Sequence, residues 1–340
     1  MGLLRQTIGI YDIIDSCMKE RVLMKTAIIL SGIPGSGKST YAKQLGLPHF
    51  SSDFIRLELF QTLRKHHTKA DDQLVFDILH ERVFSCDTSL IYDATNISRN
   101  MRGELYQKFK SRGYHVELHM ILEPLMFANF QNERRSFEKV VPFYVLNDMY
   151  KFMGAPRVGV DCDAYKIISQ SKFLNPNVNY SDFVSVAEDK GINQAVKQFI
   201  NAAYLPEFIK LTENHESPYH LEDIDEHINM CIKNAPTDVL KIVSILHDLG
   251  KSQAKENGHY KGHDMISSMY ALRFFDEIKN VPKEIIPRDI IEIVYHHMTA
   301  HQGLSEKVIQ QHKLEPHVVA SIQAFNDIDE KSRFSTVSKS

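Results

Sequence analysis

The sequence predicts an α/β domain built on a parallel sheet, followed by an all-α domain. Three observations support this prediction. Short apolar runs alternate with helical patterns in the first half of the 340 residues, the strand pattern disappears from about residue 205, and eleven of the seventeen histidines lie beyond residue 200. Strands that alternate with helices are typical of a parallel sheet. The uneven distribution of histidine indicates that the two halves carry different chemistry.

The composition limits the classes of protein to which the chain can belong. A chain of 340 residues is longer than one compact core usually serves, which favours two domains. The net charge of −3 gives no global basic field of the kind that marks many nucleic-acid-binding proteins. The four cysteines form no CxxC pair, so neither a disulfide framework nor a zinc ribbon is expected. No apolar run reaches the length of a membrane span, and no signal-peptide pattern opens the chain.

The elements of the first half follow from its apolar runs. Residues 1–23 are expected to be an N-terminal helical extension, because residues 8–22 carry a short amphipathic pattern. Buried strands are predicted at residues 26–31, 89–92 and 114–122. Helices are predicted at residues 40–47 and 99–111, each ending near a glycine. The α/β domain is therefore placed at residues 24–170.

The second half is predicted to be helical. Residues 171–204 are polar, contain an Asn-Pro-Asn sequence and are predicted to be a connector. From residue 205 onward only helical periods remain, so residues 205–340 are predicted to form the all-α domain. The expected helices are at residues 221–234, 237–250, 264–279, 283–299 and 304–328.

A phosphate-binding loop follows the first predicted strand. Residues 32–39 satisfy the pattern G-x-x-x-x-G-K-[ST], in which glycines let backbone N–H groups converge on phosphate oxygens. The Lys38 side chain is expected to reach the β- and γ-phosphates of ATP, and that of Ser39 to hold Mg²⁺. A chance glycine-rich turn is disfavoured by the strand before the loop and the helix after it. The expected nucleotide-binding residues are Gly32, Gly35, Ser36, Gly37, Lys38, Ser39 and Thr40.

Two polar clusters follow apolar segments. A carboxylate at Asp53 is placed to accept a proton from an attacking hydroxyl, and Arg56 lies three residues on, within reach of the same site if a helix begins there. The alternative is a helix N-cap aspartate beside a surface arginine. The sequence Asp-Ala-Thr-Asn at 93–96 suits a ligand site at the edge of a parallel sheet, and its alternative is a polar turn.

A third cluster is the pair Arg134 and Arg135, in a polar segment before Pro142. Arginines on such a segment clamp a transferring phosphate in many phosphotransferases. The alternative is a solvated charge run, which is the usual case for an arginine pair.

Taken in order, these motifs resemble the kinase domain of the bacteriophage polynucleotide kinase-phosphatase family over residues 24–170. The resemblance implies that Asp53 activates a polynucleotide 5′-hydroxyl and that Arg56 contacts the acceptor phosphate. It also implies that Arg135, with Arg134 as the alternative, binds the phosphates of ATP. Gln131 stands where the family has a second lid arginine.

The histidines of the second half form a pattern. His247 and Asp248 end an apolar helical run, and His227 lies twenty positions earlier. Neutral imidazoles and carboxylates are ligands that divalent transition metals prefer, and such ions activate water or clamp phosphate. A lone histidine is more often a surface or core residue, and that interpretation is given to His215, His220, His312 and His317.

The order H…HD…H…HH…D, with the local sequences LHDLGK and YHHMTAHQG, resembles the HD phosphohydrolase superfamily over residues 215–330. The resemblance implies a helical fold that binds one or two divalent ions of the Mn, Ni, Co, Zn or Mg class, and it places Lys251 near the phosphate. Asp329 is the rival of Asp327, because the two lie two residues apart. The implied metal ligands are His227, His247, Asp248 and Asp327 at a first site and His263, His296 and His297 at a second.

Together the two resemblances imply a bifunctional enzyme that heals RNA or DNA ends for a ligase acting downstream. An ATP-dependent 5′-hydroxyl kinase would be joined to a metal-dependent 3′-phosphatase or 2′,3′-cyclic phosphodiesterase. The alternatives are a nucleoside or small-molecule kinase fused to an HD nucleotide hydrolase, and a nucleotide-sensing switch. A cytoplasmic location is expected, in the host cytoplasm if the protein is phage-encoded, with no membrane partner.

Overall fold

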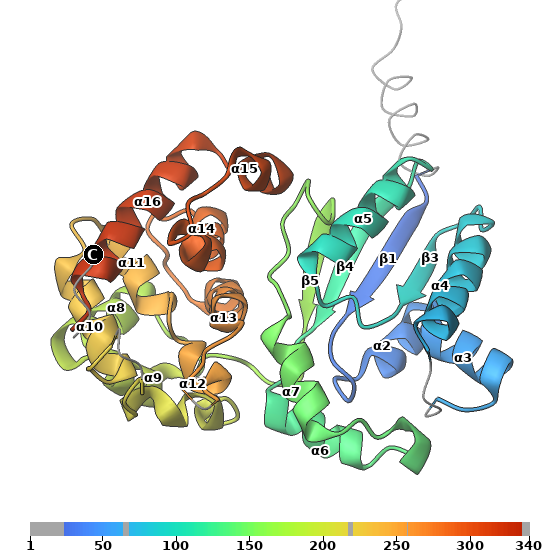
Figure 1. Cartoon of the computed structure of the whole chain (residues 1–340), viewed down its shortest axis with the longest axis horizontal. Helices are drawn as coiled ribbons and strands as arrows, with labels where there is room; N and C mark the ends of the chain where they lie inside the picture. Colours follow the sequence, from blue (N-terminus) through green and yellow to red (C-terminus); the bar gives the residue numbers. More distant parts are fainter. Residues whose placement is uncertain (1–23, 64–67, 217–219, 257, 335–340) are drawn as a thin grey trace, which may run out of the picture.

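The computed structural model describes residues 24–63, 68–216, 220–256 and 258–334. The helix predicted over residues 8–22 lies outside this part of the chain. Over the described residues an α/β half is followed by a helical half, as predicted, and Figure 1 shows the two halves side by side. None of the described helices is both long and apolar enough to cross a lipid bilayer.

The first half is built on a sheet whose strands all pair in parallel, in the order β2-β3-β1-β4-β5. In this order β1 is flanked by β3 and β4, so the loops that leave β1 and β3 lie next to each other at the carboxyl edge. Ligands bind at such a point in open α/β sheets. The strands are β1 (Thr26–Ser31), β2 (His49–Ser51), β3 (Leu90–Asp93), β4 (His115–Ile121) and β5 (Ala164–Ile168).

Helices cover both faces of this sheet. Successive residues of β1 point to opposite faces, so Ile28 and Leu30 pack with α2, whereas Ala27 and Ile29 belong to the larger core that includes α4 and α5. The helices of this half are α2 (Lys38–Leu45), α3 (Ser52–Phe60), α4 (Lys69–Phe84), α5 (Arg99–Lys110), α6 (Leu125–Glu133), η1 (Phe137–Lys139) and α7 (Phe143–Lys151).

The second half contains helices only over its described residues. Its elements are α8 (Tyr180–Lys190), α9 (Ile192–Phe199), η2 (Leu205–Thr212), α10 (Ile224–Asn234), α11 (Asp238–Leu246), α12 (Lys251–Ala254), α13 (His263–Glu277), α14 (Pro287–Ala300), α15 (Glu306–His312) and α16 (Pro316–Lys331).

Two sequence expectations for this half are wrong. Residues 171–204 are not a plain connector, because they contain α8 and α9, and Phe183 of α8 lies 4.9 Å from Phe274 of α13 between ring centroids. The single helix expected over residues 304–328 is two helices. α15 ends at Lys313, whose left-handed backbone (φ 49°) breaks the helix, and α16 starts at Pro316.

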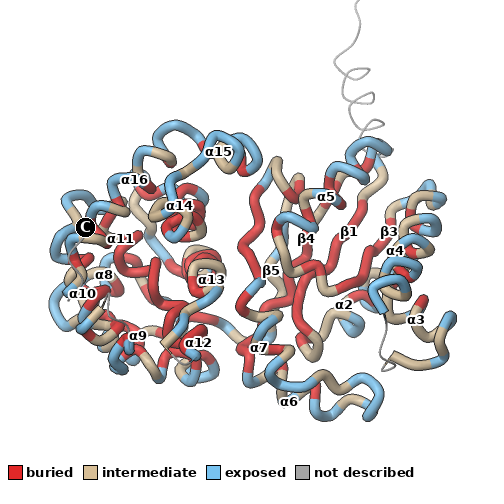
Figure 2. Tube along the Cα trace, in the orientation of Figure 1, coloured by how far each residue is buried: buried red, intermediate tan, exposed pale blue. Residues whose placement is uncertain are grey.

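The two halves share one hydrophobic core, and Figure 2 shows buried segments in the sheet and on the inner sides of the helices. At the junction Arg99 donates through both terminal nitrogens to the Glu292 carboxylate, at 2.9 and 3.0 Å, and both side chains are buried. The Arg99 guanidinium also lies 3.8 Å from the ring centre of Tyr295. Arg99 begins α5 and Glu292 lies on α14, so this pair joins the two halves directly.

A second polar tie crosses the same junction. Glu207 of η2 accepts hydrogen bonds from the Leu125 backbone N–H at 2.7 Å and from the hydroxyls of Tyr150 and Tyr270 at 3.0 and 2.6 Å. Burial raises the pKa of Glu207 to about 6. The start of α6 and the body of α7 are thereby tied to the helical half.

We predict that Arg99→Leu destabilises the whole protein by about 3–5 kcal/mol, because the variant leaves the buried Glu292 carboxylate without its partner. The double variant Arg99→Leu, Glu292→Leu should recover part of this loss, since it removes the stranded carboxylate, although Arg157 Nη1, 3.9 Å from Glu292 Oε1, loses its ion partner. Urea unfolding of both variants measures the difference. Arg82→Leu, which removes an exposed pair with Glu58, serves as the control and should change little. Equal losses in the single and double variants would contradict the prediction.

Candidate functional site

The loop after β1 has the backbone geometry of an anion-binding site. Gly37 caps α2 with a left-handed backbone (φ 99°), and Gly35 is also left-handed (φ 84°), where a Cβ would collide with the Ala128 carbonyl oxygen. Both positions therefore favour glycine. The Oγ of Ser36 is buried and has no hydrogen-bond partner among the described residues, which leaves it free for a ligand oxygen.

The Lys38 side chain folds back over this loop. Its Nζ donates to the carbonyl oxygens of Gly32 at 2.6 Å and Ile33 at 3.1 Å. Burial lowers the pKa of Lys38 to about 8, although the carboxylates of Asp93 and Asp53 oppose the change. A phosphate group placed here would give the ammonium an anionic partner in place of two neutral carbonyls.

A cavity of about 1000 Å³ opens in front of the loop at the carboxyl edge of the sheet. Asp53 and Arg56, both predicted from sequence, line it from α3. The Asp53 backbone N–H donates to Ser51 Oγ at 3.2 Å, so this aspartate is held in the first helical turn. Arg56 Nη1 donates to Asp72 Oδ1 of α4 at 2.6 Å, which fixes the guanidinium beside the cavity.

The two candidate lid arginines lie in different places. Arg135 lines the cavity, and its burial there lowers its pKa, with Asp53 opposing the change. Arg134 is exposed, and its guanidinium stacks on the ring of Phe130 at 4.3 Å. The structure therefore brings Arg135 to the loop and leaves Arg134 outside the cavity.

The segment that carries these arginines is tied at its base. The buried Asn132 donates from Nδ2 to the Val141 carbonyl at 2.7 Å and accepts the Val141 N–H on Oδ1 at 3.0 Å. These two hydrogen bonds bring residues 132 and 141 together and close the segment between them into a loop. Gln131 lines the cavity at the position where the resembling family has an arginine.

Asp93 was predicted from sequence only as part of the 93–96 segment, with no role of its own. It ends β3, is 5% exposed, lines the cavity and lies within hydrogen-bond distance of His49 Nε2, at 2.9 Å. The sequence signal was its place directly after an apolar run. Ser39 and Asp93 both line the cavity and offer oxygen ligands of the kind that Mg²⁺ prefers.

Four histidines of the helical half present the same ring nitrogen to one centre. In each, Nδ1 lies 2.7–3.2 Å from a backbone carbonyl oxygen that can accept an Nδ1–H, and Nε2 is the nitrogen that faces the centre. Histidines that bind metals are usually oriented in this way. The four are His227 on α10, His247 at the end of α11, His263 at the start of α13 and His297 on α14.

Asp248 lies between these imidazoles. Its Oδ2 is 3.5 Å from His227 Nε2 and 3.1 Å from His247 Nε2. Its Oδ1 is 3.3 Å from His263 Nε2 and 3.6 Å from His297 Nε2. Burial alone would raise the pKa of Asp248, but His247 holds that pKa well below its ordinary value. A carboxylate that faces two pairs of imidazoles with its two oxygens has the geometry of a bridge between two metal ions.

The carboxylate that α16 contributes comes from Asp329, and the assignment to Asp327 is wrong on geometry. Asp329 is 3% exposed, with Oδ1 2.8 Å from His227 Nε2 and Oδ2 2.8 Å from His301 Nε2. Asp327 lies two residues earlier, about 200° around the helix, and is exposed. Asp329, which the sequence had left open as the alternative, is therefore the residue that lies at the cluster.

His296 is also misassigned, because neighbouring residues on a helix point about 100° apart. Its ring lies 4.6 Å from that of His312 and its Nε2 is 3.7 Å from Glu292, at the junction of the halves. Burial lowers the pKa of His296 to about 2, so the ring is neutral. His301, one turn after His297, lies at the edge of the cluster instead.

Cations surround the open side of this cluster. Lys251, which the resemblance placed near the phosphate, has its Nζ 2.6 Å from Asp248 Oδ2. Arg333, which sequence reasoning missed, donates to Asp329. A cavity of about 530 Å³ is lined by both cations, by Asp248 and Asp329, and by His263, His297 and His301. The position has the charge to hold a phosphate ester against the histidines.

The donor set fits divalent metal ions. His247 Nε2 and Asp248 Oδ1 are buried without a hydrogen bond, and their nearest partners are ion-pair contacts with Asp248 Oδ2 at 3.1 Å and His263 Nε2 at 3.3 Å. Imidazole nitrogens with carboxylate oxygens suit first-row transition ions. Donor atoms within 4.8 Å of one another form three groups among the described residues: His227, Cys231, His247 and Asp329; Asp248, His263 and His297; and His215, His220 and Glu222.

Comparison with known proteins bears on the first half. A family model described as an AAA domain matches residues 28–156. Together with the loop geometry, this match identifies residues 28–156 as a P-loop kinase-like domain. Among curated proteins there is no match.

Several solved structures are similar to part of the chain. A Pnkp1/Rnl/Hen1 complex has 20% identity and a TM-score of 0.30, covering 35% of this chain and 41% of that chain. A sugar kinase from Janibacter sp. HTCC2649 has 16% identity and a TM-score of 0.33, covering 43% and 85%. A gluconokinase from Sinorhizobium meliloti 1021 has 18% identity and a TM-score of 0.31, covering 44% and 85%. The chain thus spans less than half the length of the first of these.

We predict that triphosphate binding weakens above pH 8. The folded pKa of Lys38 is about 8, so the side chain is charged below that pH and must take up a proton to pair with phosphate above it. The affinity for a non-hydrolysable ATP analogue should hold below pH 8 and fall by about tenfold per pH unit above it. Isothermal titration at several pH values measures this slope. Lys38→Met should bind more weakly with no slope, and Lys43→Met, an exposed lysine of α2, should behave as the parent. A flat profile for the parent protein contradicts the prediction.

Proposed function

We propose that the protein heals broken nucleic-acid ends, with an ATP-dependent 5′-hydroxyl kinase in the first half and a metal-dependent 3′-phosphatase or 2′,3′-cyclic phosphodiesterase in the second. The observation that supports the proposal is that one chain holds two separate polar cavities of different chemistry. One is the cavity at the phosphate-binding loop, lined by Asp53 and Arg56, and the other is lined by histidines and carboxylates of the helical half.

In the kinase site each charged side chain has a role. Asp53 accepts the proton of a 5′-hydroxyl as its oxygen attacks the γ-phosphate of ATP. Lys38 and Arg135, on opposite sides of the cavity, stabilise the charge that develops on the transferred group. Arg56, held by Asp72, contacts the phosphate of the acceptor strand. Ser39 and Asp93 supply oxygen ligands for Mg²⁺.

In the hydrolase site a bound divalent ion would lower the pKa of water and polarise the phosphate. The ligands that this chain supplies are the four converging histidines with Asp248 and Asp329. Lys251 and Arg333, which line the cavity, pair with the phosphate oxygens. Ions of the Mn, Ni, Co, Zn or Mg class fit this donor set. The products, a 5′-phosphate and a 3′-hydroxyl, are what a ligase requires.

Acceptor choice tests the kinase half of the proposal. With ATP, 5′-hydroxyl oligonucleotides of RNA or DNA should be phosphorylated in preference to nucleosides or sugars. Asp53→Asn should lower kcat by about 10²- to 10⁴-fold because it removes the general base, with little effect on the KM for ATP. Asp77→Asn, an exposed carboxylate of α4, is the matched control. Phosphorylation of nucleosides or sugars but not of oligonucleotides would favour the small-molecule alternative.

The pair Asp329 and Asp327 tests the hydrolase half. Asp329→Asn should lower phosphate release from 3′-phosphate oligonucleotides on the order of 100-fold or more, because it removes a carboxylate that contacts His227 and His301. Asp327→Asn should retain activity, since its side chain is exposed. Both variants should keep the 5′-kinase activity. Equal behaviour of the two variants in the phosphatase assay would contradict the placement of the site.

A further inference from the structure

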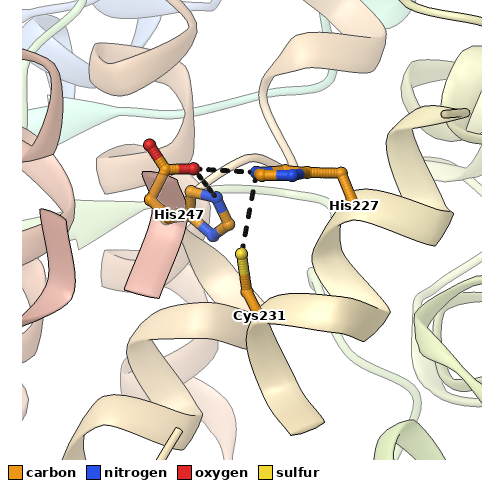
Figure 3. Close-up of side chains that lie close together, drawn as sticks. His227, Cys231 and His247 are labelled. Atoms are coloured by element: carbon orange, nitrogen blue, oxygen red, sulfur yellow. Dashed lines mark hydrogen bonds and ion pairs between the residues drawn. The ribbon is translucent and has the colours of Figure 1, made fainter. Parts of the chain in front are cut away.

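Cys231 lies inside the histidine-carboxylate cluster, although neither resemblance gives it a role. It follows His227 by one turn of α10, so both side chains lie on the same face of the helix. Its side chain is fully buried, and its Sγ is 3.6 Å from His227 Nε2. Figure 3 shows His227, Cys231 and His247 pointing toward one another. The Sγ is also within 4.8 Å of the donor atoms of His247 and Asp329.

The distance between Cys231 and His227 matches that of two ligands of one metal ion. With Zn–N of about 2.0–2.1 Å and Zn–S of about 2.3 Å, a tetrahedral site puts its nitrogen and sulfur about 3.5 Å apart. The Sγ–Nε2 distance of 3.6 Å agrees with that value. Asp329 Oδ1 lies closer to His227 Nε2, at 2.8 Å, and farther from His247 Nε2, at 3.9 Å. The four donors are two imidazoles, one thiol and one carboxylate.

A buried cysteine is often just a small apolar residue, and Cys231 does belong to the buried apolar core. Its sulfur, however, also lies beside three metal-binding donors, those of His227, His247 and Asp329. His247 Nε2 is buried here without a hydrogen bond, and Asp248 Oδ2 lies 3.1 Å from it as an ion-pair partner. An ion held with the thiolate would use the lone pair of that nitrogen.

The two metal-binding groups differ in their access to the cavity. Asp248, His263 and His297 all line the cavity of about 530 Å³. His227, Cys231 and His247 do not line it and are fully buried, whereas Asp329, the fourth member of their group, does line it. Structural metal positions are closed by protein ligands, whereas catalytic positions keep one side open to water or substrate. The three buried donors therefore lie deeper than Asp248, His263 and His297, and only Asp329 connects their group to the cavity.

We propose that Cys231 is a direct metal ligand together with His227, His247 and Asp329, in a position that lies deeper than Asp248, His263 and His297, which face the cavity. The proposal rests on the metal-dependent hydrolase function proposed above. The thiol of Cys231 releases its proton to solvent as the sulfur–metal bond forms. A thiolate ligand selects ions such as Zn²⁺ or Co²⁺ over Mg²⁺, so the position with Cys231 retains a thiophilic ion.

Cobalt substitution of the full-length protein tests this directly. Metal-free protein is titrated with Co²⁺ and followed by absorption, since thiolate ligation adds a sulfur-to-cobalt charge-transfer band in the near ultraviolet to the visible bands of any bound Co²⁺. The parent should show both features. Cys231→Ser should keep visible bands and lose the charge-transfer band, and should bind the first equivalent on the order of tenfold more weakly or worse, as expected for a direct ligand. Cys162→Ser, which alters a buried cysteine of the first half, should keep the band.

The outcomes separate this inference from the proposed function. Visible bands without a charge-transfer band in the parent would show that Co²⁺ binds without Cys231, which overturns the inference and leaves the metal site standing. Absence of Co²⁺ binding altogether would overturn both. Zinc-edge X-ray absorption on the parent protein requires no variant that might misfold. One sulfur at about 2.3 Å supports the inference, and a shell of nitrogen and oxygen alone refutes it.

Discussion

The buried pair of Arg99 and Glu292 is the contact on which the arrangement of the two sites depends. Arg99 starts α5 a few residues after the turn 93–96 at the phosphate cavity, and Glu292 lies on α14 about one turn before His297. Separating the halves would break this buried pair and expose the shared apolar core to water. The two sites are therefore held on one body at a fixed separation. Under the proposed function, a nucleic-acid end would have to reach each site by its own movement.

Within the helical half, the backbone itself orients the imidazoles. For His247, His263 and His297 the carbonyl that accepts Nδ1–H belongs to the residue three positions earlier. That partner is supplied by the local chain, so each ring presents Nε2 before any tertiary contact is made. His227 differs, because its partner carbonyl belongs to Ser332 after α16. Helix packing then only has to bring three preoriented rings to one centre. The fourth ring, that of His227, is oriented by the carbonyl of Ser332.

This difference between local and tertiary control explains what could be predicted from sequence. The phosphate loop was predictable because strand, glycines and helix are contiguous, and their geometry is local. The order of histidines and carboxylates identified the cluster, but the choice of Asp327 and His296 failed because it needed the rotation of each helix about its axis. Residues 171–204 were predicted to be a connector because they are polar and contain an Asn-Pro-Asn sequence, and the helices that they form, α8 and α9, are short and separated by Gly191. Cys231 follows His227 at the i, i+4 spacing of a helix, but only the fold places it beside His247.

The ligand chemistry of the two sites explains how one chain could carry both activities under the proposed function. Ser39 and Asp93 at the phosphate loop offer oxygen ligands, which Mg²⁺ prefers. The buried group with Cys231 adds nitrogen and sulfur to the oxygen of Asp329, and these bind later first-row ions far more strongly than Mg²⁺. Mg²⁺ therefore has little affinity for the buried group. Under the proposed function, the hydrolase site would depend on a later first-row ion even where Mg²⁺ is abundant.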